Sequence, residues 1–124
     1  MAQAIRETIE RYVQLMTTGP APELAALYAP DAVVVDPIGS EPRRGAAIEQ
    51  LYAALDVMEQ RKAELHTARI NGSHAAFWFT LITEANGHRM TLSAIDVMEF
   101  DDEGRITSMR AYWDPAELQF EPIG

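Results

Sequence analysis

Cysteine is absent from this sequence, so disulfide bridges and thiolate metal ligands are excluded. Basic residues are scarce as well: 10 lysines and arginines stand against 19 aspartates and glutamates, which gives a formal net charge of −9 at pH 7. Such an acidic chain repels nucleic-acid phosphates and anionic lipid headgroups. We therefore expect its partner to be an uncharged or cationic small molecule, with no nucleic acid and no membrane involved.

Long hydrophobic runs are also missing, although 48% of the 124 residues are hydrophobic. No segment is apolar for long enough to cross a bilayer. The first stretch, MAQAIRETIERYVQ, mixes charged and apolar residues, so we expect no signal peptide. The length suits one domain over residues 1–124 with a single core or pocket. A cytoplasmic domain is the expectation.

Several common site motifs are missing too. The three histidines, His66, His74 and His88, have no short metal-ligand spacing, so no metal site is expected. Ser40 lacks the G-x-S-x-G context of an activated nucleophile, and the chain has no glycine-rich phosphate loop. Metal, serine-nucleophile and phosphate-loop chemistry are therefore not indicated.

The first half of the chain has mainly helical periodicity. Apolar residues recur every three or four positions in three segments: 5–16 before Gly19-Pro20, 24–28 after Pro22, and 48–58 after Gly45. Between the last two, the stretch AVVVD at 32–36 is short and β-branched and is stopped by Pro37. It predicts one strand among three helices.

The second half has the composition of strands. Runs rich in β-branched, aromatic and other apolar residues predict strands at 63–70, 75–84, 88–100 and 105–113, and Asn86-Gly87 is a strong hairpin signal. Most aromatic residues here are expected in the core: Phe77, Trp78, Phe79 and Phe100. Helices followed by an antiparallel meander predict an α+β fold, with the helices covering one face of a curved sheet that can enclose a pocket.

One residue breaks the pattern of the strand at 88–100. From Met90 to Phe100 its even-numbered positions share one face, and five of the six are apolar; the exception is Asp96. A buried carboxylate is costly unless it is paired or loses its charge. Three explanations stay open: a bulge that turns Asp96 to solvent, a buried ion pair with an arginine or lysine, or a protonated acid that donates a hydrogen bond.

Four further side chains allow a structural and a functional interpretation. Asp36 precedes Pro37 and either caps a turn or acts as a general base at the mouth of a pocket. Tyr12, Tyr28 and Tyr52 all lie on predicted helices. They are either core residues with one wet end, or phenols that point inward and hydrogen-bond to one another and to a ligand.

Taken together, these residues resemble a known family. The stretches that carry the likeness are RYVQLM, LYAPDAVVVDPIGSEPRRG, LYAAL, AIDVMEFDDEGRI and MRAYW. In them the sequence resembles the bacterial ketosteroid isomerases (steroid delta-isomerases), which share a cone-shaped α+β fold with nuclear transport factor two and scytalone dehydratase. The resemblance runs nearly end to end. It implies three N-terminal helices packed on a curved, mixed or antiparallel sheet that encloses an apolar pocket.

The resemblance also implies roles for individual residues. Asp36 matches the proton-shuttling base of the family. Tyr12 matches the tyrosine that donates to the substrate oxyanion, and Asp96 matches the protonated aspartic acid that donates beside it. Tyr28 and Tyr52 match tyrosines that support the oxyanion donor by hydrogen bonds. The implied reaction converts a 3-oxo-Δ5-steroid to the conjugated Δ4 isomer by proton transfer through a dienolate.

Substrate and partners follow from the same resemblance. Trp113, Phe79 and Met109 are expected to help wall the steroid pocket; no cofactor or metal is required, and a homodimer that packs sheet against sheet is implied. Two alternatives stay open: a hydratase or polyketide cyclase of the same fold, or a non-catalytic binder of steroid-like ligands. Epoxide hydrolases of this fold need an Asp-Arg-Asp set, and the sequence places no arginine convincingly on the pocket face.

Overall fold

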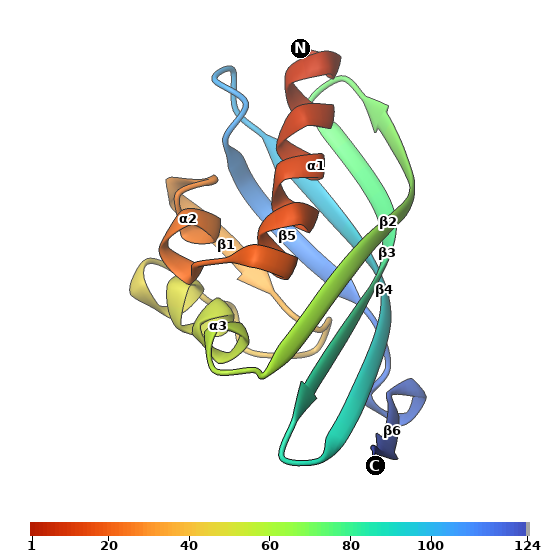
Figure 1. The fold of residues 1–124 in the computed structure, drawn as a ribbon. Helices are drawn as coiled ribbons and strands as arrows, with labels where there is room; N and C mark the ends of the chain where they lie inside the picture. The colour runs from red at the N-terminus through yellow and green to blue at the C-terminus, as the bar shows by residue number, and fades with distance from the viewer. Residues whose placement is uncertain (124) are drawn as a thin grey trace.

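The computed structural model describes residues 1–123, in which three helices lie against one face of a mixed sheet (Figure 1). The helices are α1 (Ala2–Thr18), α2 (Ala21–Ala25) and α3 (Ala46–Asp56), with a short 3-10 helix at Pro115–Glu117. The strands are β1 (Tyr28–Val35), β2 (Gln60–Asn71), β3 (His74–Ala85), β4 (His88–Phe100), β5 (Ile106–Tyr112) and β6 (Gln119–Pro122). The predicted α+β class is confirmed.

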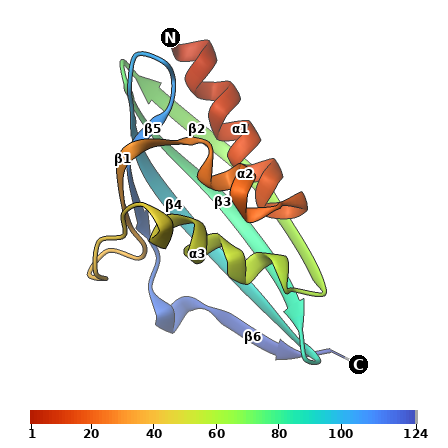
Figure 2. The same cartoon turned by 90° about the vertical axis from the view of Figure 1, so that its left-hand side faces the viewer.

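The sheet is built around a long antiparallel hairpin. Its strand order is β1-β5-β4-β3-β2, and β6 pairs with the part of β4 next to the β3–β4 turn (Figure 2). Among the strand pairings within residues 1–123, only β1–β5 is parallel, so the sheet is mixed. Asn86 and Gly87 have φ angles of 54° and 76°, the left-handed values that a two-residue hairpin turn of this type requires. The predicted hairpin is therefore present.

The hydrophobic core lies between the helices and the inner face of the sheet. One side of α1 is buried through its apolar stripe of Ile5, Ile9, Val13 and Met16. On the sheet, alternate residues of β3, β4 and β5 face this stripe, because successive strand side chains point to opposite faces. The helix α3 covers the other end of the same face, and a cavity lies beneath it.

Several local predictions were wrong. Tyr28 is the first residue of β1 rather than part of a helix, because it pairs with Ile106 of β5, and tertiary pairing overrides local helix propensity. The third helix ends at Asp56, before Met58. Strand β6 was not predicted, since its four exposed residues carry no alternation. Trp78 is not in the core: it lies on the outer face of the sheet.

Candidate active site

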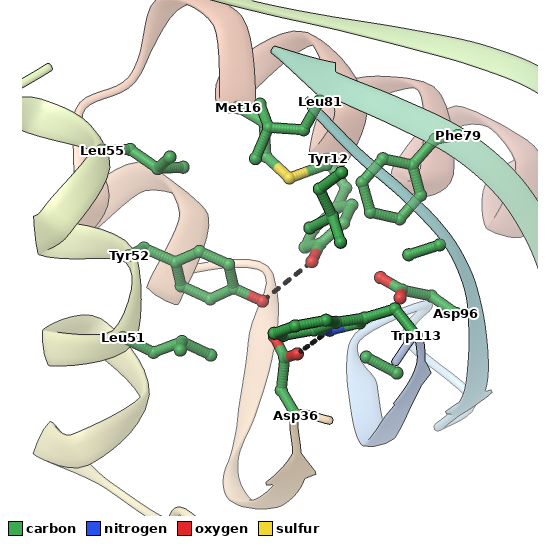
Figure 3. Close-up of a pocket in the computed structure, with 13 residues that line it drawn as sticks. Tyr12, Met16, Asp36, Leu51, Tyr52, Leu55, Phe79, Leu81, Asp96 and Trp113 are labelled. Carbon is green, nitrogen blue, oxygen red and sulfur yellow. Dashed lines mark hydrogen bonds between the residues drawn. The ribbon is translucent and has the colours of Figure 1, made fainter. Parts of the chain in front are cut away.

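A cavity of about 130 Å³ lies between α1, α3 and the inner face of the sheet (Figure 3). Most of its wall is aliphatic or aromatic. The polar groups that face it are the Tyr12 and Tyr52 hydroxyls, two carboxyl groups, and the indole of Trp113. The full lining is Tyr12, Met16, Asp36, Leu51, Tyr52, Leu55, Phe79, Leu81, Leu92, Ala94, Asp96, Ala111 and Trp113. An apolar pocket with a few convergent polar groups is the usual form of a small-molecule site.

Asp96 occupies the inner face of β4, deep in this cavity. It pairs in regular register with Phe77 and Ala111, so no bulge turns it outward, and only 1% of its surface is exposed. Within residues 1–123, neither of its carboxyl oxygens has a hydrogen-bond partner and no basic side chain forms an ion pair with it. The solvent-facing and ion-pair explanations are therefore wrong.

The environment of Asp96 favours its neutral form. Burial raises its pKa well above the usual value, the negative charge of Asp36 raises it further, and the nearby Tyr12 hydroxyl opposes the rise. A protonated carboxyl has an O–H that can donate a hydrogen bond, whereas an ionised one only accepts. The Asp96 side chain and the Tyr12 hydroxyl point into the same space (Figure 3).

Three tyrosines from three elements form a chain of hydroxyl groups. The Tyr12 and Tyr52 oxygens are 3.0 Å apart, and the Tyr28 and Tyr52 oxygens are 2.5 Å apart. All three side chains are buried, and burial is the first cause that raises the pKa of each phenol above its usual value. The phenols therefore stay protonated. At the cavity, the Tyr12 oxygen can accept from Tyr52, which leaves the Tyr12 proton available to a ligand.

Asp36 lines the same cavity and directly follows β1. The indole Nε1 of Trp113 donates to its Oδ1 at 2.7 Å (Figure 3). Burial raises the pKa of Asp36, while the Trp113 hydrogen bond and the charge of Arg43 lower it. Arg43 comes close because the loop after Pro37 folds back and pairs with Val34. In the described residues, Asp36 accepts from an indole rather than capping a turn.

This arrangement can be compared with known proteins. The family model of the SnoaL-like domain matches residues 9–109, which is most of the chain. A steroid Delta-isomerase from Nocardioides simplex is 41% identical over 123 residues, covering 98% of this chain and 99% of that protein.

The chain belongs to the SnoaL-like domain family.

Two other similar proteins are named for different chemistry. The epoxide hydrolase LasB from Streptomyces lasalocidi is 28% identical over 119 residues, which is 90% of this chain and 42% of that longer protein. A solved structure of the epoxide hydrolase/cyclase-like enzyme SalBIII, reported for pyran ring formation in the polyether salinomycin, has a TM-score of 0.85 and 22% identity over 94% of this chain and 95% of that one. This second likeness shows the shared fold. The predicted resemblance to steroid delta-isomerases is confirmed by the first relative.

Two of the three residues predicted to wall the pocket lie at the cavity. Trp113 and Phe79 line it. Met109 does not: it is fully buried in the core, and Ala111, two residues further along the same face of β5, reaches the cavity instead. Leu51 and Leu55 of α3 were missed as lining residues, although the helical stripe of α3 carries them and indicates which face they share.

The remaining predictions concern sites away from the cavity. The three histidines are exposed: His66 lies within β2, and His74 and His88 begin strands. The described part of the chain has no group of three or more histidine and acidic side chains that could hold a metal ion. None of the helices in residues 1–123 is long and apolar enough to cross a membrane.

Proposed function

We propose that the protein is a steroid delta-isomerase, an enzyme that converts 3-oxo-Δ5-steroids to conjugated 3-oxo-Δ4-steroids. The nearly full-length likeness to the Nocardioides simplex enzyme supports the activity. The observation that carries the proposal is the cavity itself. Its lining brings together the Asp36 carboxyl group, the Tyr12 hydroxyl and the buried Asp96 carboxyl group on otherwise apolar walls.

Asp36 is the proposed base. The reaction requires removal of a weakly acidic proton next to the ketone and its return two carbons further along. One carboxylate can perform both steps if it reaches over a flat substrate and its protonated form is shielded from water. The partly buried position of Asp36, with one oxygen held by the Trp113 indole, supports this role. A positioned general base typically contributes ~10²–10⁴-fold to the rate.

Tyr12 and Asp96 are the proposed donors to the ketone oxygen. As the proton leaves, negative charge develops on this oxygen in the dienolate, and hydrogen bonds set in advance stabilise it. Neutral donors suit an apolar cavity, because a lysine or arginine would have to be desolvated there. Tyr52 and Tyr28 support Tyr12 through the hydroxyl chain, which strengthens its donation.

The apolar lining supports a neutral, steroid-like substrate. Leu51, Leu55, Phe79 and Leu81 supply contact surface from both sides of the cavity. A hydrophobic wall favours the transfer of fused hydrocarbon rings from water and lowers the local dielectric, which strengthens the hydrogen bonds to the ketone. The proposed chemistry is complete with these side chains, and none of its steps calls for a cofactor.

The test is ultraviolet absorbance of the purified protein with a β,γ-unsaturated 3-ketosteroid, which follows the appearance of the conjugated enone. We expect rapid conversion that falls by ~10²–10⁴-fold in Asp36→Asn, since the base is lost while the shape is kept. Binding of the conjugated product, followed by quenching of tryptophan fluorescence, should persist in the variant. Asp31→Asn, at an exposed position of the strand that precedes Asp36, is the matched control.

Two outcomes would contradict this assignment. Loss of product binding together with activity in Asp36→Asn would indicate a structural role for Asp36. Steroid binding without isomerisation by the unaltered protein would indicate a non-catalytic binder.

The second candidate function is that of an epoxide hydrolase or cyclase, which the similarity to LasB and SalBIII suggests. The cavity argues against it. An Asp-Arg-Asp set would need a guanidinium at the substrate, and no arginine lines the cavity in the part of the chain that the structure describes. Release of a diol from an epoxide substrate, with no enone formed from the ketosteroid, would favour this candidate.

We also propose that the protein forms a homodimer through the outer face of the sheet. Trp78, Ile95 and Tyr112 lie there on three adjacent strands and are 45–48% exposed. Ile95 pairs directly with both Trp78 and Tyr112, so the three form one continuous row. Large apolar side chains gathered on an open sheet are typical of a surface that another molecule covers. A second copy of the chain would bury this row against its own equivalent.

A further inference from the structure

A second cavity, of about 230 Å³, lies beside the β3–β4 turn. It is lined by residues from the segment after α3, the hairpin and β6: Met58, Thr83, Ala85, Asn86, His88, Met90 and Phe120. Asn86 and His88 are exposed at its rim, where the His88 ring is bonded to the Asn86 carbonyl. Met58, Met90 and Phe120 give it an apolar floor and walls. None of these residues belongs to the proposed catalytic machinery.

The walls of the two cavities are continuous. On β4, Leu92 lines the first cavity and Met90, the next residue on the same face, lines the second. On β3, Leu81 lines the first cavity, and Thr83, the next residue on the same face, lines the second. Thr83 pairs directly with Met90. The inner face of the hairpin therefore runs from one cavity into the other without a change of side.

The end of helix α3 with the segment after it, and strand β6, form the other walls of the two cavities. Leu55 near the end of α3 lines the first cavity, and Met58, three residues later, lines the second. Phe120 of β6 pairs directly with Met90, so its side chain stands on the same face. Strand β6, which lies beside the β3–β4 hairpin (Figure 2), thus contributes an aromatic side chain to the wall of the second cavity.

Size supports joint use of the two cavities. Ligand pockets usually measure about 300–1,000 Å³. Each cavity alone is smaller than this range, and the two together fall within it. A four-ring substrate whose ketone reaches Tyr12 and Asp96 must therefore extend out of the first cavity.

The position of the ketone at Asp96 sets the direction in which the substrate extends. Along β4, Asp96 lies six positions after Met90, about 20 Å at the usual rise of a strand. With the C3 ketone at Asp96, the far end of the rigid ring system, C17, points toward Met90. Another recess opens past Leu92 and Trp113, but it is lined by Asp114 and Glu117, whose carboxylates disfavour an alkyl group.

We infer that the second cavity is a subsite for an alkyl chain on C17 of the steroid. This inference rests on the proposed isomerase function and names the substrate class: 3-oxo-Δ5-steroids that keep a cholesterol-type side chain. Met90, Phe120 and Met58 would contact the chain, and Met90 would be the residue that determines whether it is accepted.

The test compares two substrates that differ only at C17, one with a ketone and one with the cholesterol-type chain. In Met90→Trp, the added ring fills the subsite. We expect kcat/KM for the long-chain substrate to fall at least about tenfold relative to the short one, since single methylenes in a pocket are worth ~10–200-fold. Thr91→Trp, on the opposite face of the same strand, should leave the ratio unchanged.

Phe120→Ala is the second variant, because its exposed side chain can be removed with little effect on the fold. It should raise KM for the long-chain substrate with kcat unchanged. Conversion of the short substrate alone by the unaltered protein would overturn the subsite and leave the isomerase function intact. An unchanged substrate ratio in Met90→Trp would do the same. Conversion of neither substrate would overturn both proposals.

Discussion

Asp36 and Asp96 face one cavity but lie in different environments. Asp96 is fully buried among apolar side chains, and neither of its oxygens has a partner among residues 1–123. Asp36 is half-buried and accepts from Trp113, with Arg43 nearby. Burial raises both pKa values, but only Asp36 has two groups that lower it. One carboxyl is thus suited to accept a proton and the other to donate a hydrogen bond.

The Trp113 hydrogen bond should tune the pH dependence of the reaction. Its donation lowers the pKa of Asp36, so Trp113→Phe should raise this pKa further. Because the base must be ionised, activity is lost as pH falls through its pKa. We therefore expect the acidic limb of the kcat/KM profile to move to higher pH in Trp113→Phe. Trp78→Phe, on the outer face, is the control; an unmoved limb in Trp113→Phe would contradict the role.

Asp96→Leu should separate catalysis from stability. Loss of one oxyanion donor is expected to lower kcat by ~10²–10³-fold. The folded state keeps a proton on Asp96 above pH ~4, where an unfolded aspartate has lost it. The unaltered protein therefore loses stability as pH rises from ~4 toward the raised pKa of Asp96. Asp96→Leu has no such loss. Its free energy of unfolding, relative to that of the unaltered protein, should therefore increase as pH rises from ~4 toward that pKa.

Urea unfolding at several pH values measures this difference, with Asp96→Asn as the variant that keeps a donor in the cavity. A relative stability of Asp96→Leu that decreases as pH rises would show instead that the folded protein stabilises an ionised Asp96.

At the scale of secondary-structure elements, the site depends on how the ends of the helices are held. The Arg61 side chain at the start of β2 donates to the Thr17 carbonyl at 3.0 Å and forms an ion pair with Asp56 at 3.1 Å. Asp56 in turn accepts from the Ala21 amide. These bonds join the end of α1, the start of α2 and the end of α3. They leave no room for a side chain at Gly19, whose φ of 59° also favours glycine.

The hydroxyl chain depends on this placement, because its members come from α1, β1 and α3. Tyr52→Phe removes both of its bonds and leaves the Tyr12 and Tyr28 hydroxyls buried without this partner. We expect a loss of ~1–3 kcal/mol in the free energy of unfolding. Activity should fall through kcat, with KM unchanged, since Tyr52 does not donate to the substrate. Steady-state kinetics and urea unfolding measure both effects.

Tyr112→Phe, which removes an exposed hydroxyl from the outer face, is the control for this experiment. A change in KM alone in Tyr52→Phe would place Tyr52 in substrate binding rather than behind Tyr12.

At the scale of the whole molecule, the two faces of the sheet differ in what they carry. The inner face, covered by helices, carries the core and the cavity; the outer face carries the row of Trp78, Ile95 and Tyr112. We expect sedimentation velocity to show a dimer. Ile95→Glu should dissociate it, because symmetry would bring two new carboxylates together. Val57→Glu, at another highly exposed apolar position, should leave it intact. A monomeric unaltered protein would contradict the dimer.

The sequence by itself determined the class of fold and the identity of the unusual residues. Apolar spacing placed α1 and α3, and Asn86-Gly87 placed the hairpin, because these signals act between near neighbours in the chain. The alternating face of β4 singled out Asp96. The family resemblance supplied the proposed roles, which spacing alone left open.

Only the tertiary structure decided which residues meet. Pairing of β1 with β5 places Tyr28 in a strand rather than in a helix. The Trp113 indole hydrogen-bonds to Asp36, and Ala111 rather than Met109 lines the cavity. The tertiary structure also brings β6 to the hairpin, where Phe120 completes the second cavity. These contacts join residues far apart in the chain, and their energies depend on packing and burial rather than on local preference. That Asp96 has no ionic partner among residues 1–123 is likewise a property of the packed structure.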